Sequence, residues 1–202
     1  ICTVSIGVLK SEKIKFTPIL SNKTQKALDG IQMGLLVKIP LLFDGSRLGF
    51  TENSFLQYDI AEKEIGRGCY FLAWPTGHDY VVGFIGGRFA WDLSKQSEDK
   101  IVEYALSKLA SLHGSNIRKH FLKGFASDWA NNPLTVGAYS AVKPGCYGAR
   151  ELLSEPIAEK LIFAGEATAG NLAGLVNGAY ESGKMAAIRI SNLIKAKISP
   201  FN

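Results

Sequence analysis

Apolar residues recur along the chain in two spacings, and each spacing predicts a kind of secondary structure. Short apolar or alternating runs are typical of strands, whereas apolar residues three and four positions apart indicate a helix. We expect strands over residues 1–8, 14–16, 33–43, 50–59, 69–74, 80–86, 136–142 and 161–164, and an extended segment over 117–129. We expect helices over residues 22–29, 98–113, 150–154 and 174–195.

Capping residues support two of these helices. Ser21 stands before the first helix and Ser97 before the second, and both residue types are favoured at a helix N-cap. Gly30 and Gly114 follow the two helices, where glycine commonly ends a helix. Both helices therefore have predicted starts and stops as well as apolar faces.

The order of the elements indicates an α+β fold. Residues 33–43 end at Asp44 and Gly45, a pair typical of a hairpin turn, so we expect antiparallel neighbours there. A mixed or antiparallel sheet with helices occupies the middle of the chain, and a strand–loop–helix unit occupies its end. This arrangement differs from the regular alternation of an α/β fold.

The composition is that of a protein with a sizeable core. The 202 residues are 47% hydrophobic and 20% charged, which disfavours disorder. No apolar run approaches the roughly 20 residues of a membrane span, because Lys38 and Pro40 interrupt the longest candidate. The net charge is +5, but the basic residues are scattered rather than gathered with aromatic residues. We therefore expect neither a membrane nor a nucleic-acid partner.

The cysteines and histidines give no sign of a disulfide framework or a metal site. Cys2, Cys69 and Cys146 include no C-x-x-C pair, and the three histidines lie far apart in the sequence. The pattern favours a reducing compartment, and we expect a cytoplasmic protein without a bound metal.

A glycine-rich stretch, FAGEATAGNLAGLVNGAYESGKMAA, covers residues 163–187. Small residues on one side of its helix allow another element or a flat ligand to approach closely. The unpaired N–H groups of the helix N-terminus also attract an anionic ligand atom. Tight core packing explains the same pattern, so the residues alone leave both interpretations open. No G-x-G-x-x-G motif opens a helix, and the chain therefore lacks a dinucleotide fingerprint.

Lys38 and Glu166 are charged residues in unusual positions. Lys38 lies within the apolar run 33–43, where burial of its ammonium group would be costly. Exposure at a strand edge is the alternative. Glu166 directly follows the apolar run 161–164, a position where carboxylates often bind hydroxyl groups or backbone amides. A solvated turn residue is the alternative for Glu166.

Several segments match a known family in family order across nearly the whole chain. They are residues 3–9 with Phe16 and Pro18; 33–38; Trp129 with Pro133 and 137–140; 163–168; and 174–183. Together they resemble the C-terminal half of the flavin-containing amine oxidases. That family comprises monoamine and polyamine oxidases, L-amino-acid oxidases and lysine-specific histone demethylases.

The resemblance implies a role for each matching position. Lys38 would contact flavin N5 through a water, and Trp129 would pack beside the isoalloxazine. Tyr139 would face the substrate over the flavin, and Leu175 would stand beside both groups. The cofactor-binding positions implied in this way are Thr3, Val4, Trp129, Gly165, Glu166, Gly174, Leu175, Val176 and Ala179.

Three departures from the family pattern qualify these roles. Ala138 stands where covalently flavinylated members have a cysteine, so FAD should bind noncovalently. Leu175 stands where many members have a second aromatic residue around the amine, so the substrate need not be a simple monoamine. The family's dinucleotide motif lies upstream. We therefore expect a C-terminal portion whose partner is the missing N-terminal dinucleotide-binding half.

The resemblance also implies a domain division and an activity. We expect residues 1–12 and 155–202 to belong to an FAD-binding domain, and 13–154 to a substrate-binding domain. The expected activity is oxidation of a small-molecule amine by hydride transfer to flavin N5, with reoxidation by O2 to H2O2. The isolated fragment should be inactive. The alternatives are a related flavin desaturase or protoporphyrinogen-type oxidase, and a flavin-free inactive fragment or binding module.

Overall fold

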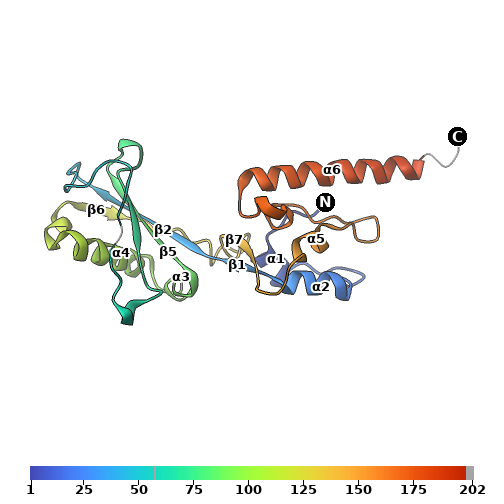
Figure 1. Cartoon of the computed structure of the whole chain (residues 1–202), viewed down its shortest axis with the longest axis horizontal. Helices are drawn as coiled ribbons and strands as arrows, with labels where there is room; N and C mark the ends of the chain where they lie inside the picture. Colours follow the sequence, from blue (N-terminus) through green and yellow to red (C-terminus); the bar gives the residue numbers. More distant parts are fainter. Residues whose placement is uncertain (57, 199–202) are drawn as a thin grey trace. The chain divides into compact units, whose positions relative to one another are not determined.

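The chain divides into two compact units in the computed structural model, which describes residues 1–56 and 58–198. The first unit joins residues 1–34 to the chain from Asn132 onward, and the second is the continuous segment 35–131. Figure 1 labels the elements of both units. The predicted functional domains have boundaries after residues 12 and 154, and that functional division stays a prediction.

A five-stranded antiparallel sheet organises the second unit, with its strands in the order β3, β4, β5, β2, β6. The strands are β2 (Leu36–Phe43), β3 (Ser54–Leu56), β4 (Tyr70–Ala73), β5 (Tyr80–Gly86) and β6 (Phe121–Gly124). The longest pairing joins β2 to β5, from Leu36 opposite Gly86 to Leu42 opposite Tyr80. The central strand β2 therefore carries the register of the whole sheet.

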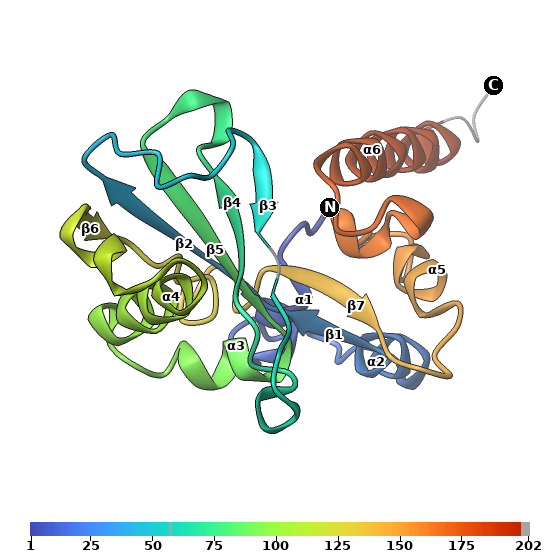
Figure 2. The same ribbon diagram turned by 60° about the vertical axis from the view of Figure 1, so that its left-hand side comes forward.

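Helices α3 (Gly87–Leu93) and α4 (Glu98–His113) pack against one face of this sheet (Figure 2). Alternate residues of β2, including Val37, Ile39 and Leu41, are fully buried on that face. Ala105 and Leu109 of α4 join the same core cluster. Each buried aliphatic side chain of this size contributes about 1.5–3 kcal/mol. The hydrophobic core of the second unit thus lies between the sheet and its two helices.

The first unit combines the long helix α6 and several shorter helices with a two-stranded sheet. Its elements are α1 (Ile6–Lys10), α2 (Asn22–Asp29), β1 (Ile31–Gly34), β7 (Tyr139–Val142), α5 (Ala149–Ser154) and α6 (Val176–Ile198). Strands β1 and β7 run antiparallel, with Ile31 opposite Val142 and Gly34 opposite Tyr139. Ile6, Ile31 and Leu153 are almost completely buried in its main core cluster. Residues from both ends of the sequence therefore build one core.

Short 3-10 turns connect these elements in both units. They are η1 (Glu62–Glu64), η2 (Pro75–Gly77), η3 (Ser115–Lys119), η4 (Glu166–Thr168) and η5 (Gly170–Leu172). The last two, η4 and η5, form the loop that leads into α6. Their compact backbone brings residues 166–172 back against α6.

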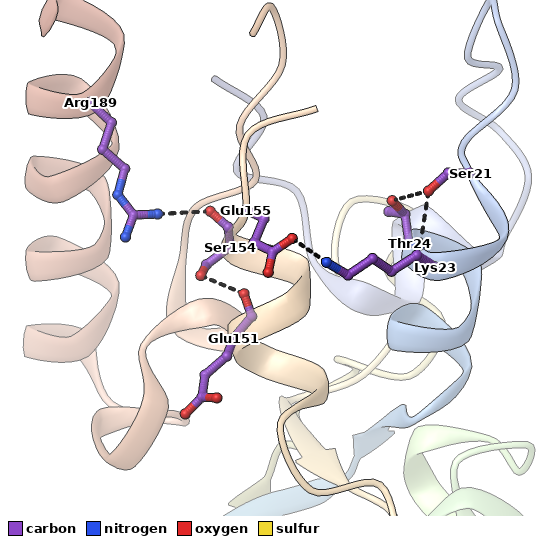
Figure 3. A network of polar contacts seen from close by, with 7 residues as sticks. All are labelled: Ser21, Lys23, Thr24, Glu151, Ser154, Glu155 and Arg189. Atoms are coloured by element: carbon purple, nitrogen blue, oxygen red, sulfur yellow. Dashed lines mark hydrogen bonds and ion pairs between the residues drawn. The ribbon is translucent and has the colours of Figure 1, made fainter. Parts of the chain in front are cut away.

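Polar contacts fasten α5 to α2 and α6 (Figure 3). Lys23 of α2 forms an ion pair with Glu155, at an Nζ–Oε2 distance of 2.7 Å. Arg189 of α6 donates a hydrogen bond to the Ser154 carbonyl oxygen at 3.0 Å. Because the Lys23–Glu155 pair is exposed, it contributes at most about 1 kcal/mol. Burial of Ala27, Leu28 and Leu153 therefore supplies most of the stabilisation between α2 and α5.

The α+β class predicted from the sequence is confirmed. The helices predicted after Ser21 and Ser97 are α2 and α4. Ser21 caps α2 as predicted, because its Oγ accepts a hydrogen bond from the Thr24 N–H at 3.2 Å. Within the described residues the Ser97 side chain makes no such capping bond. No helix in the described ranges is long and apolar enough to cross a membrane.

The predicted strand over residues 1–8 is wrong. Cys2 forms only an isolated parallel bridge with Phe163, and α1 begins at Ile6. Ser5 Oγ accepts a hydrogen bond from the Val8 N–H and so caps this helix. Ile6, Val8 and Leu9 are instead buried on this one short helix, and a pattern of so few residues cannot distinguish a helix from a strand.

Other predicted strands are divided, shortened or absent. Residues 33–43 form β1 and β2, which pair in different sheets. No hairpin forms at Asp44 and Gly45, because β2 pairs with β5 and β6. Residues 14–16 form no strand, and residues 161–164 form only isolated bridges. Residues 117–129 begin with η3. Of residues 50–59, only Ser54–Leu56 form a strand, and Gln57 lies outside the described residues. Apolar runs show where a strand is possible but not which partner it pairs with.

Candidate functional site

The carboxylate of Glu166 joins two other segments of the first unit. Ser140 donates from its N–H to Oε1 at 2.9 Å and from its hydroxyl group to Oε2 at 2.8 Å. The Gly174 N–H also donates to Oε2, at 2.8 Å. Hydrogen bonds to a charged acceptor contribute about 1.5–3 kcal/mol each. Glu166 therefore holds strand β7 to the loop that precedes α6.

Arg150 of α5 supports this arrangement from the other side of Ser140. Its Nη1 donates to Ser140 Oγ at 2.6 Å and to the Ala167 carbonyl oxygen at 2.9 Å. Its Nη2 donates to the Ser140 carbonyl oxygen at 3.0 Å. Burial lowers the pKa of Arg150, and the nearby charge of Glu166 opposes that shift. Because an arginine remains charged in proteins, its guanidinium balances the Glu166 carboxylate.

Ser182 of α6 fixes the other end of the same loop. Its Oγ accepts a hydrogen bond from the Gly165 N–H at 3.1 Å and lies 2.6 Å from Thr168 Oγ1. Thr168 in turn donates to the Gly165 carbonyl oxygen at 3.1 Å. Gly165 has a φ of +125°, and a Cβ placed on it would lie 3.7 Å from the Thr3 carbonyl oxygen. The loop is therefore held beside the N-terminal segment.

The first turn of α6 is open toward solvent. Gly174 has a φ of +78°, and a Cβ placed on it would meet nothing within 4 Å. Among the described residues, no acceptor binds the N–H groups of Val176 and Asn177. Leu175 is 50% exposed and Val176 90% exposed. The helix thus presents free N–H groups, with their partial positive charge, beside apolar side chains.

Tyr139 lies across Gly34, its partner on the neighbouring strand. A Cβ on Gly34 would approach Cε2 of the Tyr139 ring to 2.7 Å, so glycine is needed beneath the ring. Tyr139 is 41% exposed. The next residue, Ser140, is the one that Glu166 binds. Tyr139 is therefore a partly exposed aromatic residue on a fixed backbone.

Lys38 lies on the face of the five-stranded sheet opposite α3 and α4. Its neighbours Val37 and Ile39 are fully buried, whereas Lys38 itself is exposed. Of the two interpretations of Lys38, the structure excludes a buried ammonium group and shows an exposed one. The Lys38 N–H donates to Ser127 Oγ at 2.9 Å, and the Ser127 N–H donates to the Lys38 carbonyl oxygen at 3.0 Å. The backbone around Lys38 is thus fixed while its side chain extends into solvent.

The open face around Lys38 is mostly apolar and aromatic. Lys38 is paired with Phe84 of β5, which is paired with Tyr70 of β4, so the three side chains form one cross-strand row. Phe55 of β3 is exposed on the same sheet. Within the five strands the charged residues are Lys38 and Lys123. Exposed apolar patches of this kind mark ligand or partner sites more often than single exposed residues do.

The predicted site residues fall into two groups. Lys38 and Trp129 belong to the second unit, where Trp129 is 46% exposed. The others belong to the first unit and are Thr3, Val4, Tyr139, Gly165, Glu166, Gly174, Leu175, Val176 and Ala179. Within the first unit, hydrogen bonds join Glu166 to Gly174 and to the neighbour of Tyr139, and Thr3 lies beside Gly165.

Sequence reasoning missed the residues that fix this arrangement. Ser140, Arg150 and Ser182 make the hydrogen bonds described above. Ser140 and Ser182 lie within the family segments 137–140 and 174–183, which imply no role for either residue, and Arg150 lies in no matched segment. The only signal was indirect, because Ser182 stands among the small residues of the α6 face.

Comparison with known proteins decides the family. The family model described as "Flavin containing amine oxidoreductase" matches residues 1–191. The chain belongs to this family. It is 32% identical to lysine-specific histone demethylase 1 homolog 2 of Arabidopsis thaliana, over 94% of the chain and 26% of the relative. It is 33% identical to polyamine oxidase 2 of the same plant, over 93% of the chain and 37% of the relative. The chain therefore spans well under half the length of these relatives.

A flavin-containing amine oxidoreductase must hold a flat ring system that becomes negatively charged when reduced. The free N–H groups of Val176 and Asn177 suit the negative charge that develops near flavin N1 and C2=O. The open Cβ position of Gly174 leaves room for close approach of a ring, and Leu175 offers an apolar contact. The residues of the first unit fit a flavin on this side.

Proposed function

We propose that this chain supplies one wall of the flavin site and part of the substrate wall of an FAD-dependent amine oxidase. FAD would bind noncovalently, because Ala138 offers no nucleophile for a covalent bond. The observation that carries the proposal is the first turn of α6. There, free N–H groups and exposed apolar side chains are fixed by the Glu166–Gly174 hydrogen bond of 2.8 Å.

The chain's own residues would bind, orient and stabilise. Bound FAD supplies the chemistry, namely hydride acceptance from the amine C–H at N5 and reoxidation by O2 to H2O2. Lys38 has three N–H donors on an exposed side chain, and we propose that it holds a water by hydrogen bonding. Tyr139 would orient the amine, and the N-terminus of α6 would favour negative charge beside it. Thr3, Val4, Trp129, Gly165 and Ala179 would complete the contacts to the cofactor.

The proposal includes a partner and a division of labour. Residues 1–12 and 155–202 would contribute to FAD binding and 13–154 to substrate binding, together with an N-terminal dinucleotide-binding half. The relatives named as a histone demethylase and a polyamine oxidase support an amine as substrate. We propose a small-molecule amine. The free cysteines Cys2, Cys69 and Cys146 agree with a reducing, cytoplasmic location.

Co-expression with an upstream half tests this function. An upstream half that bears a G-x-G-x-x-G motif would be produced together with the 202-residue chain. We expect a yellow complex that forms peroxide from amines. Lys38→Met should keep the flavin absorbance but lower turnover by about 100-fold or more. Lys123→Met, the matched change at the other lysine of the sheet, should preserve turnover. A colourless complex in excess FAD would contradict the proposal.

A related flavin oxidase that acts on C–C or ring C–N bonds is the second candidate. Leu175 favours it, because this half-exposed residue stands where many amine oxidases have a second aromatic residue. A substrate panel on the reconstituted complex separates the two functions. Turnover of amines supports the first, and turnover confined to substrates without an oxidisable amine supports the second.

A further inference from the structure

Residues 161–164 form an apolar, extended segment of the first unit that is paired along one edge. Cys2 forms a parallel bridge with Phe163. The Cys2 N–H donates to the Ile162 carbonyl oxygen at 2.8 Å, and the Ala164 N–H donates to the Cys2 carbonyl oxygen at 2.9 Å. A sheet needs three or more strands for independent stability. This bridge is therefore only the beginning of a sheet.

The opposite edge is unpaired at Phe163. Successive residues of a strand direct their N–H and C=O groups to opposite edges. Because Ile162 and Ala164 bond to Cys2, the N–H and the carbonyl oxygen of Phe163 point to the other edge. Neither group has a hydrogen-bond partner in the part of the chain that the structure describes. Phe163 is 3% exposed, and buried backbone groups nearly always have a partner. Phe163 thus lacks two hydrogen bonds of the kind that a neighbouring strand supplies.

The neighbouring residues on the same edge are already paired. Leu161 and Ile157 exchange two backbone hydrogen bonds, at 2.7 and 3.1 Å. The Gly165 N–H donates to Ser182 Oγ at 3.1 Å, and its carbonyl oxygen accepts from Thr168 Oγ1 at 3.1 Å. The two unpaired groups therefore lie between satisfied ones, so the gap belongs to one position and is not the fraying of an end.

A cavity of about 240 Å³ adjoins this gap. Its lining includes Ile162 and Phe163, Ser154 at the end of α5, and one side of α6 with Met185. Arg189 of α6 donates to the Ser154 carbonyl oxygen at 3.0 Å and so joins the two walls (Figure 3). The volume greatly exceeds that of one water, which occupies about 30 Å³ of liquid. The cavity therefore leaves room for polypeptide backbone beside the segment.

Both faces of the segment are covered, although this edge is not. On one face, Ile162 and Ala164 pack against Ala186 of α6. On the other face, the ring of Phe163 packs edge-to-face against Phe16 at 5.9 Å, within the main core cluster of the unit. A continuous apolar run with helices on both faces is typical of a parallel sheet. These surroundings suit a strand that runs parallel to residues 161–164.

We propose that an apolar strand of the upstream half adds to the first unit at this edge, parallel to residues 161–164. The strand would pair with the N–H and the carbonyl oxygen of Phe163 and would lie between α5 and α6. The inference rests on the proposed function for the source of the strand. Its contacts are backbone hydrogen bonds and apolar packing, so they need no flavin.

A peptide tests the edge without the upstream half and without a cofactor. The probe is the acetylated and amidated peptide KVVIVK, added to the ¹⁵N-labelled 202-residue chain. Amide hydrogen exchange measured by NMR should slow by roughly tenfold or more at Phe163, the effect of one new hydrogen bond. The Ala164 amide, already bonded to Cys2, should change little. The same peptide with N-methylated valines and isoleucine cannot donate backbone hydrogen bonds and should have no effect.

Matched variants and a spin label locate the peptide. Met185→Trp, which narrows the cavity, should weaken binding by roughly tenfold or more, whereas Ala187→Trp, at an exposed α6 position outside the lining, should leave it unchanged. A nitroxide at the peptide N-terminus should broaden the signals of Lys160 and Leu161 more than that of Gly165. The reverse order would overturn the parallel arrangement.

The outcomes separate this inference from the proposed function. No change at Phe163 up to about 1 mM peptide, an affinity at the weak end of the scale, would overturn the inference. An equal effect of the N-methylated peptide or of N-methylacetamide, a small amide, would also overturn it. A yellow, active complex with the upstream half in which the Phe163 amide stays unprotected would contradict only the strand addition. A colourless complex in which that amide is protected would support the strand addition and contradict only the proposed function.

Discussion

Glu166 illustrates how one side chain can shape a site without being free to bind a ligand. Both of its carboxylate oxygens accept hydrogen bonds within the chain, from Ser140 and Gly174. A cofactor near this residue would therefore meet the loop that Glu166 holds in place more readily than the carboxylate itself. The role we propose for Glu166 in cofactor binding follows from that position.

Removing the charge of Glu166 should loosen the first unit. In Glu166→Gln the amide nitrogen cannot accept hydrogen bonds from Ser140 or Gly174, so we expect a loss of about 1–3 kcal/mol in unfolding free energy. Urea denaturation followed by circular dichroism measures the loss. Glu181→Gln is the matched control, because Glu181 is an exposed acid whose ion pair with Lys184 spans 4.0 Å. Equal stability of the two variants would show that the Glu166 contacts contribute nothing.

Glu103 should make stability depend on pH in the acid range. Hydrogen bonds from Arg118 and Ser107 lower the pKa of Glu103 from 4.5 to about 2. Because the folded pKa is the lower one, the stabilisation is complete above about pH 4.5 and disappears as the pH falls toward 2. Glu103→Gln should be less stable than the parent chain at neutral pH, by less than about 1 kcal/mol for so exposed a pair. The difference should vanish near pH 2, and a pH-independent deficit in denaturation curves would contradict this account.

At the scale of elements, α6 has two glycines with different surroundings. A Cβ on Gly178 would overlap the carbonyl oxygen of Leu172, whereas a Cβ on Gly183 would meet nothing within 4 Å. The first glycine lets the helix pack against η5, and the second faces open space. The same residue type on one helix therefore has a packing role at one position only.

Alanine substitutions separate these two roles. Gly178→Ala should lower the unfolding free energy by about 1–3 kcal/mol, because the backbone must move to admit the methyl group. Gly183→Ala should be neutral or stabilising by up to about 1 kcal/mol, through helix propensity alone. Thermal unfolding followed by circular dichroism compares the two variants. The packing argument fails if Gly178→Ala is as stable as Gly183→Ala.

The sequence predicts elements better than it predicts their partners. Helices α2 and α4 have favoured N-cap residue types, glycine stops and apolar faces within a few residues, so local patterns suffice even though only Ser21 forms its capping bond among the described residues. The division of residues 33–43 into β1 and β2 depends on pairing with strands up to about a hundred residues away, which periodicity does not encode. The site shows the same limit. Family motifs indicate Lys38 and Tyr139, but the hydrogen bonds of Arg150 and Ser182 depend on contacts between distant segments.

For the whole molecule, the two units differ in how the chain builds them. The second unit is one continuous segment, and its core cluster lies entirely within residues 35–131. The first unit needs residues 1–34 together with the chain from Asn132 onward. The second unit alone therefore has the local information for an independent core.

Residues 35–131 should fold when expressed alone. All five strands of the larger sheet and helices α3 and α4 lie in this segment. We expect dispersed amide signals and a cooperative unfolding transition, since the buried core is complete. Phe71→Ala, which removes a fully buried ring, should cost about 3–5 kcal/mol and abolish the transition. A segment that stays unfolded under native conditions would show that its core depends on the rest of the chain.

The discontinuity of the first unit has a consequence for synthesis on the ribosome. Cys2 must wait until Ile162 and Ala164 have been made before its backbone hydrogen bonds can form. At about 5–20 residues per second, that delay amounts to roughly 10–30 s, during which the continuous segment can complete its own fold. The apolar residues Ile6 and Ile31 lack the later-made members of their core, such as Leu153, for most of that interval. A chaperone that binds short apolar segments would therefore find residues 1–34 accessible before residues 155–202 have been made.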